Sequence, residues 1–408
     1  MMMRERRLLV LVIGLAILVA LGCKGPAAAD ASLALAPVPV GTPVDGPGGL
    51  TVPHGRLARI GEGPDAIDVL YLDGTPRQMG YAHGRLLGPT IRKFYGATIL
   101  GMSIGMKVPV EKLDEAWAQM APFVSADLKQ EMRGLADGAG VSLQMVQRAH
   151  AIPDLSEYHC TFFGAWGKAT PNGHLIQIRA LDYATEASIQ NYRTIFVYKP
   201  KGKIPFVVPG WAGMIGALSG ISGQGIAVSE IGDNFGDEKE TLAGTPMPFL
   251  LREVLERAHN VGEGTMIVQK AHRTSSYLYC IGDGKAPAAR SMMTCHDFAY
   301  VFDPHSQPHQ QLDDVVYFSM GADSTWNDKV YWVLKNKFGH IDENVAMQDV
   351  MKGLKTGSLH AIAWDVTELK MWVANCKAAG MGTKGEPGYD QVFEPFDVGV
   401  ALGMRAAK

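Results

Sequence analysis

The spacing of apolar residues divides the chain into a helical part and a strand-rich part. Residues 65–76 form a short apolar run before a Gly-Thr-Pro turn, which predicts a strand that ends in a turn. Between Arg77 and about Glu157 the apolar positions recur at helical spacing instead. Ser125 can cap one helix there and Gly140 can end it. The helices expected in this part are 79–100, 110–120 and 125–140.

From Cys160 onward the apolar pattern has a period of two, which is typical of strands. Antiparallel strands interrupted by pairs of helices predict an α+β domain in which helices cover the sheet faces. Regular strand–helix–strand alternation is missing, which argues against a doubly wound parallel sheet. The expected strands are 160–168, 174–182, 193–199, 214–219, 225–231, 275–282, 299–303, 314–320, 360–366 and 370–376, with helices at 248–260, 265–273 and 324–338.

The first 22 residues have the pattern of a signal peptide. Three arginines precede an uncharged apolar run, Leu8 to Gly22, which is short for a membrane-spanning helix of ~20 residues. The run ends in Ala-Leu-Gly-Cys, which resembles the lipobox of bacterial lipoproteins and makes Cys23 the lipidated residue, although Ala20 stands where leucine is favoured. Cleavage by an ordinary signal peptidase near Ala27 is the alternative. We expect an exported protein of the bacterial cell envelope, attached to the membrane through a lipid anchor.

Residues 23–55 are rich in Ala, Pro and Gly and predict a flexible tether between that anchor and the folded part. The 408-residue chain is 47% hydrophobic and 19% charged, so it can bury a large core. Its net charge is −3 and no Lys or Arg run follows the first seven residues, which excludes a nucleic-acid partner. After export, Cys280, Cys295 and Cys376 could include one disulfide in any of three pairings, or remain buried thiols.

A hairpin that begins at Cys160 carries the main candidate chemistry. The Thr-Pro-Asn-Gly sequence of residues 170–173 predicts a turn, because Asn and Gly tolerate positive φ and Pro presets the entry. With the turn centred near Asn172, antiparallel pairing places Asp182 opposite Phe162. Asp182 and Arg179 are therefore expected near the cysteine.

The base for Cys160 can come from its own backbone. A guanidinium lowers the pKa of a nearby thiol towards reactive values. A cut between His159 and Cys160 would free an α-amino group with a pKa of about 7.7–8, which suits a general base. The thiol could make that cut itself, by attacking the preceding carbonyl. An inert core cysteine beside an ordinary Arg–Asp ion pair is the alternative explanation of the same residues.

Four segments of the chain resemble one known family in their order and spacing. They are residues 74–89, the hairpin from Cys160 with its Arg-x-Leu-Asp element, the glycine-rich strands 213–232 and the helix at 244–256. The chain is similar to the acyl-coenzyme A:6-aminopenicillanic-acid (isopenicillin-N) acyltransferase-like group of N-terminal nucleophile hydrolases. Bile salt hydrolases and phospholipase-B-like proteins are relatives of that group. The likeness spans about residues 65–375.

The resemblance implies an αββα sandwich of two antiparallel sheets. It also implies self-cleavage before Cys160, and cleavage or transfer of an acyl group held through a linear amide bond. Cys160 would be the nucleophile that forms a thioester, Asp182 would hold its α-amine, and Arg179 would lie beside it. The expected parts of this one domain are a mainly helical N-terminal fragment, 56–159, and a catalytic fragment, 160–408.

The chain also departs from the pattern of that family. Ala180 stands where many members have Asn, and no asparagine occupies the usual oxyanion-hole position. The candidates for oxyanion or substrate contacts are Ser229, Glu230 and Asn234, with backbone amides as an alternative. Residues 315–321 lack the Thr-Asn-His-like element common near that point. The resemblance therefore predicts the nucleophile more firmly than the substrate contacts.

Two rival functions stay open, a phospholipase-B-like lipid acyl hydrolase and a non-catalytic surface lipoprotein that binds a ligand on the same scaffold. The expected partner is a small-molecule N-acyl substrate, whose acyl chain Trp166 or Trp211 could contact. No cofactor and no metal site is expected, because His305 and His309 lie in a loop without helical presentation. Residues 220–225 predict a tight hairpin rather than a phosphate loop, since no Lys or helix start follows.

Overall fold

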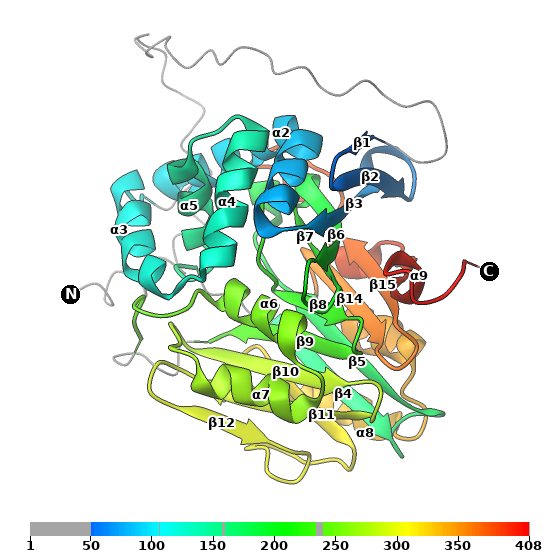
Figure 1. Ribbon diagram of the computed structural model, residues 1–408. Coiled ribbons are helices and arrows are strands. Elements are labelled where there is room, and N and C mark those ends of the chain that lie inside the picture. Colours follow the sequence, from blue (N-terminus) through cyan, green and yellow to red (C-terminus); the bar gives the residue numbers. More distant parts are fainter. Residues whose placement is uncertain (1–49, 106, 157–159, 234–239, 408) are drawn as a thin grey trace.

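The computed structural model describes residues 50–105, 107–156, 160–233 and 240–407. In this part of the chain two β-sheets pack against each other and helices cover their outer faces (Figure 1). The signal peptide, Cys23 and most of the expected tether lie outside the described residues. Among the helices that are described, none has the length and apolar content needed to cross a bilayer.

The larger sheet has ten strands in the described residues, in the order β1-β2-β3-β6-β7-β8-β9-β10-β11-β12. Its neighbours are antiparallel except for β3 and β6. The chain leaves this sheet after β3 and returns at β6, which lets these two strands run parallel. The bounds are β1 Thr51–Val52, β2 Gly55–Ile60, β3 Ile67–Gly74, β6 Arg193–Pro200, β7 Phe206–Trp211, β8 Ser219–Ser222, β9 Ile226–Gly232, β10 Tyr277–Asp283, β11 Ala288–Thr294 and β12 Ala299–Phe302.

The smaller sheet has six antiparallel strands in the described residues, in the order β13-β4-β5-β14-β15-β16. Strand β4 begins at Cys160 and lies between β13 and β5, so both of its backbone edges are paired. The inner faces of the two sheets touch where Gln177 donates to Ser229 (3.0 Å). The bounds are β4 Cys160–Gly167, β5 Gly173–Leu181, β13 Val315–Ser319, β14 His360–Asp365, β15 Lys370–Asn375 and β16 Glu394–Asp397.

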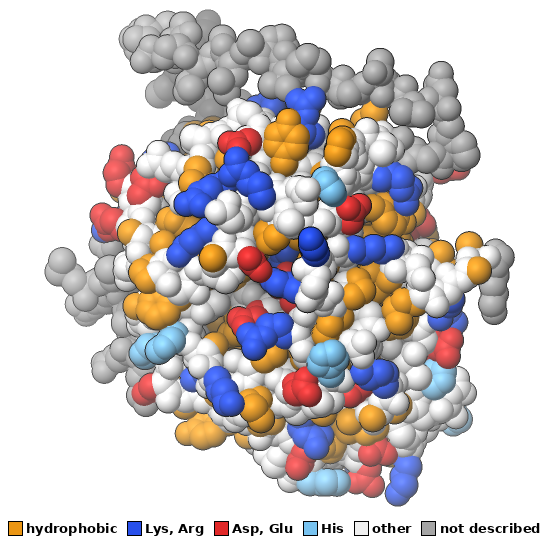
Figure 2. All heavy atoms as spheres, viewed as in Figure 1, with side chains coloured by type: hydrophobic (Ala, Val, Ile, Leu, Met, Phe, Trp, Pro, Cys, Tyr) orange, Lys and Arg blue, Asp and Glu red, His pale blue; other side chains and the backbone are white. Residues whose placement is uncertain are grey.

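Helices form the two outer layers. Helices α2, α6 and α7 pack on the larger sheet and α4 packs on α2, whereas α8 and the π-helical η8 pack on the smaller sheet. Ser125 caps α4 and Gly140, with a φ of 65°, ends it, as expected. On the face drawn in Figure 2, Lys and Arg side chains lie among Asp and Glu. The bounds are α2 Pro76–Leu100, η3 Gly101–Gly105, α3 Val110–Met120, α4 Ala126–Ala139, α5 Leu143–Ala151, α6 Met247–Arg257, α7 Val261–Lys270, α8 Trp326–Asn336, η8 Val345–Lys352 and α9 Val398–Ala401.

A buried arginine joins the helices before Cys160 to those after it. Arg252 of α6 donates to both carboxylate oxygens of Glu131 of α4, at 2.9 and 2.7 Å, and its Nε donates to Glu256 at 2.8 Å. Its guanidinium also lies over the ring of Tyr198, 4.6 Å from the centroid. The guanidinium charge is therefore paired with two carboxylates, which makes its burial tolerable.

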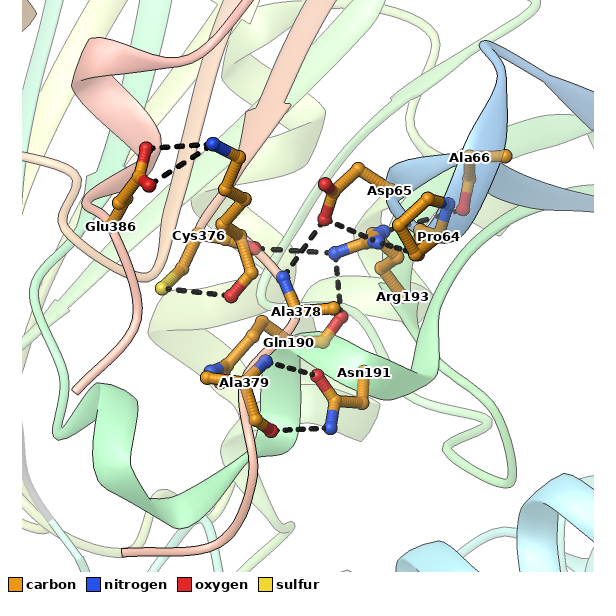
Figure 3. A network of polar contacts seen from close by, with 11 residues as sticks. Pro64, Asp65, Ala66, Gln190, Asn191, Arg193, Cys376, Ala378, Ala379 and Glu386 are labelled. Carbon is orange, nitrogen blue, oxygen red and sulfur yellow. Dashed lines mark hydrogen bonds and ion pairs between the residues drawn. The ribbon is translucent and has the colours of Figure 1, made fainter. Parts of the chain in front are cut away.

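A second arginine network joins the segment before β3 to the segment after β15 (Figure 3). Arg193 donates to the carbonyl of Pro64 (2.6 Å), to Asp65 (3.0 Å) and to the carbonyl of Cys376 (3.2 Å). Asp65 also accepts from the backbone N–H of Ala378 (2.8 Å). Chain segments separated by about three hundred residues are thus held together by one guanidinium.

The α+β class with helices on both sheet faces agrees with the prediction from the sequence. The strand expected at 214–219 is wrong, because residues 214–218 connect β7 to β8 and only Ser219 belongs to a strand. Strand β7 itself was not predicted, since Pro209 interrupts its pattern. Strands β7 and β8 pair only at Phe206 and Val207, so a proline is tolerated beyond that point. The hairpin at 220–225 is confirmed, with Gly225 at a φ of 68°.

Candidate active site

The hairpin of β4 and β5 has a different register from the expected one. Cys160 pairs with Leu181, so Asp182 follows the strand directly and does not lie opposite Phe162. The cause is the turn, which spans the residues between Gly167 and Gly173. Gly173 of the predicted Asn-Gly pair has a positive φ of 73°, but the second positive φ, 55°, is at Gly167 and not at Asn172. The register of the pair also shifts between Ala165 and Gly167.

The thiol of Cys160 lies fully buried between the two sheets. Burial raises its pKa above the ordinary value, Arg179 lowers it, and the carboxylates of Glu230 and Asp182 raise it. The expected effect of the arginine is therefore present, but the cost of burying a thiolate exceeds it. In the uncut chain the thiol is protonated at neutral pH.

Arg179 faces the larger sheet and pairs there with Glu230 of β9. The pair involves one guanidinium nitrogen, Nη2, and one oxygen of the carboxylate. The side chain is only 1% exposed, yet its Nε and Nη1 have no hydrogen-bond partner among the described residues. A buried guanidinium with two unused donors is costly unless a ligand meets them.

A pocket of about 110 Å³ lies beside Arg179. Residues 208–211 of β7, which have no partner in β8, line it. Both Arg179 and Glu230 lie on its wall, together with Trp211, one of the two tryptophans expected to contact an acyl chain. Most of the lining is apolar and includes Phe94, Ile152, Leu181, Ile189, Phe196, Val208, Met214, Leu218, Met247 and Leu359.

Asp182 is held by the chain that precedes β14. Its carboxylate accepts from the hydroxyl of Thr356 (2.6 Å) and from the backbone N–H groups of Gly357 (3.0 Å) and Ser358 (2.8 Å). Burial raises the pKa of Asp182, and these three donors lower it. Thr356 also contacts Thr161 of β4 at 3.0 Å, so the hydrogen bonds tie the carboxylate to the strand of Cys160.

Of the remaining candidate residues, two are described by the structure and two are not. Ser229 donates to the carbonyl of Ile178 (3.0 Å) and is fully buried in the sheet interface, so its hydroxyl is already used. Glu230 is the partner of Arg179. His159 and Asn234 lie outside the described residues. Cys280, Cys295 and Cys376 are free thiols, so the possible disulfide among them is not formed.

Comparison with known proteins gives a match to one family model over part of the chain. Residues 168–297 match the family model described as acyl-coenzyme A:6-aminopenicillanic acid acyl-transferase. The resemblance to this family that the sequence predicted is confirmed over these residues. The matched segment begins after Cys160 and includes Arg179, Asp182 and Glu230.

Similarity to individual known proteins is distant. Protein dcd1A of Dictyostelium discoideum is 28% identical over 376 residues, covering 82% of this chain and 83% of that protein. Protein dcd1B of the same organism is 26% identical over 354 residues, covering 79% and 70%. A solved structure, the Caenorhabditis elegans ortholog of N-acylethanolamine-hydrolyzing acid amidase, is 16% identical with a TM-score of 0.39, covering 51% of this chain and 93% of that one.

Sequence reasoning missed the residues that hold the candidate site in place. Thr356 and Ser358 lie more than 170 positions from the Asp182 that they contact, and their local sequence carries no motif. Glu230 was considered as an oxyanion or substrate contact, and its pairing with Arg179 across two sheets has no local signal either. The one clue in the sequence was an arginine among the apolar residues of a predicted strand, because a buried arginine needs an acidic partner.

Proposed function

We propose that the protein is a self-cleaving cysteine hydrolase or acyltransferase that acts on the linear amide bond of a small N-acyl substrate. The observation that carries the proposal is the fully buried Arg179. It lies near Cys160, and its two unused donors border an apolar pocket. Cys160 would be the nucleophile, Asp182 would hold its α-amine, and Arg179 would bind the substrate carbonyl oxygen.

Maturation would use the thiol of Cys160 as an internal nucleophile. Its Sγ adds to the carbonyl carbon of His159 while the proton passes to the amide nitrogen, and the C–N bond breaks to leave a thioester. Water then hydrolyses the thioester, which returns the thiol and leaves a carboxylate on His159. The freed α-amine of Cys160 has an ordinary pKa of about 7.7–8, so it can serve as the base that the described side chains lack.

Turnover would repeat the same chemistry on a substrate amide. The α-amine takes the thiol proton, Sγ attacks the acyl carbon, and the α-ammonium group returns the proton to the departing amine nitrogen. Water or a second amine then attacks the thioester. A carboxylate offers about four lone-pair sites, and three donors reach Asp182, so one site remains for the α-ammonium group.

The pocket supports an apolar acyl group. Burial of each acyl methylene in such a lining would contribute about 0.8 kcal/mol to binding. Arg179 and Glu230 are the ionisable side chains on the wall, and they lie together at one place. The acyl chain would therefore bind along the apolar wall, with the amide beside the arginine.

Replacement of Cys160 tests both steps. Wild-type protein should give two bands on a denaturing gel, the larger beginning with the sequence Cys-Thr-Phe-Phe, and should hydrolyse N-acyl amides. Cys160→Ala should give one uncut chain without activity. Cys280→Ala is the matched control, because Cys280 is an equally buried free thiol whose pKa burial also raises.

The outcomes separate the rival functions. Intact and active wild-type protein would overturn the self-cleaving mechanism. Turnover of phospholipid in place of N-acyl amides would favour a lipid acyl hydrolase. A Cys160 that does not react with iodoacetamide, with no turnover of either substrate, would favour a non-catalytic binding protein.

We also propose that the protein is exported and carries a lipid on Cys23. The apolar run before Cys23 and the lipobox-like ending support this. Intact mass spectrometry of protein from the native envelope should show the mass of a diacylglycerol-modified N-terminus at Cys23. An N-terminus near Ala27 would indicate an ordinary signal peptidase instead.

A further inference from the structure

The segment between β7 and β8, residues 212–218, forms one wall of the pocket; we call it the wall segment. Met214, Gly216 and Leu218 line the cavity from this segment, and Trp211 lines it from the end of β7. The segment belongs to neither strand, so no sheet ladder fixes its backbone. Its position must therefore be set by other contacts.

Side chains from the helices before Cys160 supply three of those contacts. The backbone N–H of Gly213 donates to Nε2 of His83 in α2 (2.9 Å), and its carbonyl accepts from the hydroxyl of Tyr95 (2.6 Å). The backbone N–H of Ile215 donates to Nε2 of His150 in α5 (3.1 Å). These three side chains are buried, and water does not compete for the bonds.

Residues that follow Cys160 in the chain also hold the wall segment. The carbonyl of Ile215 accepts from Arg252 (2.6 Å), and the N–H of Ala217 donates to the carbonyl of Pro248 (2.8 Å). These bonds fix the far end of the wall segment. At the near end, the side-chain hydrogen bonds that the described residues make to the Gly213 backbone come from α2, one to its N–H and one to its carbonyl.

Both histidines are suited to accept a hydrogen bond. Burial lowers the pKa of His83 to about 3 and that of His150 to about 4, so the rings are neutral at neutral pH. Nδ1 of His150 contacts the carbonyl of Val146 at 2.7 Å, which assigns the proton to Nδ1 and leaves Nε2 as the acceptor. The ring of His83 packs on Phe196, itself a pocket residue, with centroids 5.0 Å apart.

Gly213 allows the close approach that this arrangement needs. Its φ is 90°, which favours glycine, and a Cβ there would lie 2.9 Å from the ring of Tyr95. The tyrosine ring therefore occupies the space beside the backbone, and its hydroxyl reaches the carbonyl. A side chain at this position would push the wall segment away from α2.

We propose that His83, Tyr95 and His150 are positioning residues that set the depth of the acyl pocket. This rests on the proposed function, because it takes the pocket as the acyl site. The helical N-terminal fragment thereby remains part of the substrate site after the cut before Cys160 separates it from the nucleophile. The wall segment selects for the length of the acyl chain, since a short chain held at Arg179 does not extend along the whole wall.

Exchange of backbone hydrogen measures the contact directly. His83→Phe keeps the ring beside Phe196 and removes the acceptor, whereas His83→Gln restores an acceptor at similar reach. Exchange of the Gly213 amide should speed up about tenfold in His83→Phe and slow again in His83→Gln. Tyr198→Phe is the matched control: it removes a buried hydroxyl that has no partner, and exchange should not change.

Chain-length preference measures the consequence. In His83→Phe and in Tyr95→Phe, KM for a palmitoyl amide should rise about tenfold, the effect of one buried hydrogen bond. The kcat of that substrate, and both constants for a butanoyl amide, should stay at wild-type values. Tyr95→Phe removes a single hydroxyl, so it keeps the test decisive if His83→Phe fails to fold.

The possible results distinguish the positioning role from the proposed function. Unchanged exchange at Gly213 with an unchanged chain-length preference would overturn the positioning role and leave the enzyme intact. An equal loss of kcat for both amides, in protein that is cut normally, would also overturn it. Wild-type protein that binds neither a palmitoyl nor a butanoyl probe would overturn the acyl pocket itself, and both proposals with it.

Discussion

Arg179 combines a buried charge with donors that the described protein leaves unused. Glu230 neutralises the charge through Nη2, but Nε and Nη1 face no acceptor in an almost wholly apolar environment. A lysine could satisfy Glu230 equally well as a point charge. The planar group with spare donors is therefore better explained by a ligand that accepts at its edge than by the needs of the fold.

Arg179→Lys separates these two roles. The lysine keeps the ion pair with Glu230 and removes the two spare donors, so the protein should still fold. Self-cleavage and turnover of substrate should be measured separately. We expect kcat/KM for N-acyl amides to fall about a hundredfold, the effect of losing a hydrogen bond to a charged donor. Arg56→Lys is the control, because this partly exposed arginine lies over the ring of Tyr71, and it should keep wild-type kinetics. Wild-type kcat/KM in Arg179→Lys would assign the residue to stability alone.

At the scale of elements, the contact between α2 and α4 sets how the N-terminal fragment is built. Gly84 of α2 lies against the backbone of α4, where a Cβ would be 2.4 Å from the nitrogen of Ala139. Gly96 lies on the exposed side of the same helix, and a Cβ there would have no heavy atom within 4 Å. One helix thus carries one glycine that the packing requires and another that it does not.

Alanine at these two positions should have opposite effects. Gly84→Ala must separate the helices or distort them, and we expect it to lower the free energy of unfolding by about 3 kcal/mol, as overpacking does. Gly96→Ala should raise it by about 0.5–1 kcal/mol, because alanine loses less entropy in a helix. Denaturant unfolding of both variants checks the pair. Equal effects would mean that α2 and α4 do not pack through this glycine.

The sequence predicts elements whose determinants are local and misses those set across the molecule. The hairpin that begins at Cys160 was found from its period-two pattern, but its register was not, because the turn begins at Gly167, whose positive φ no local pattern indicated. The wall segment was taken for a strand, since its apolar residues face a pocket instead of a sheet neighbour. The donors to Asp182 come from residues 356–358, which no local pattern connects to it.

At the scale of the whole molecule, the N-terminal fragment and the rest of the chain form one body. Arg252 pairs with Glu131 across the boundary, and Arg193 bonds Pro64 and Asp65 (Figure 3). Strand β3 is hydrogen-bonded to β6 along its length. A single cut before Cys160 would leave all these contacts in place. The two fragments would then separate only under denaturing conditions, which is why the wall segment can depend on both.

Buried ionisable groups also set how the whole molecule responds to pH. Burial lowers the pKa of His83 to about 3, of His150 to about 4 and of His360 to about 3, from 6.5. The unfolded chain therefore binds more protons below pH 6.5, so this part of the stability is complete above pH 6.5 and is lost as the pH falls. Burial raises the pKa of Asp154 to about 6, and its effect has the opposite sign.

The three histidines should each favour a loss of stability on acidification, and Asp154 should oppose it. Between pH 7 and pH 5 each histidine should contribute a loss of about 2 kcal/mol, and Asp154 should return about 1 kcal/mol. His150→Gln keeps an acceptor for Ile215 and should make the loss smaller by about 2 kcal/mol, whereas Asp154→Asn should make it larger by about 1 kcal/mol. Denaturant unfolding at both pH values, in the uncut Cys160→Ala background, keeps the comparison to one chain. A loss of the same size in His150→Gln as in its parent would show that this histidine is charged or exposed in the folded protein.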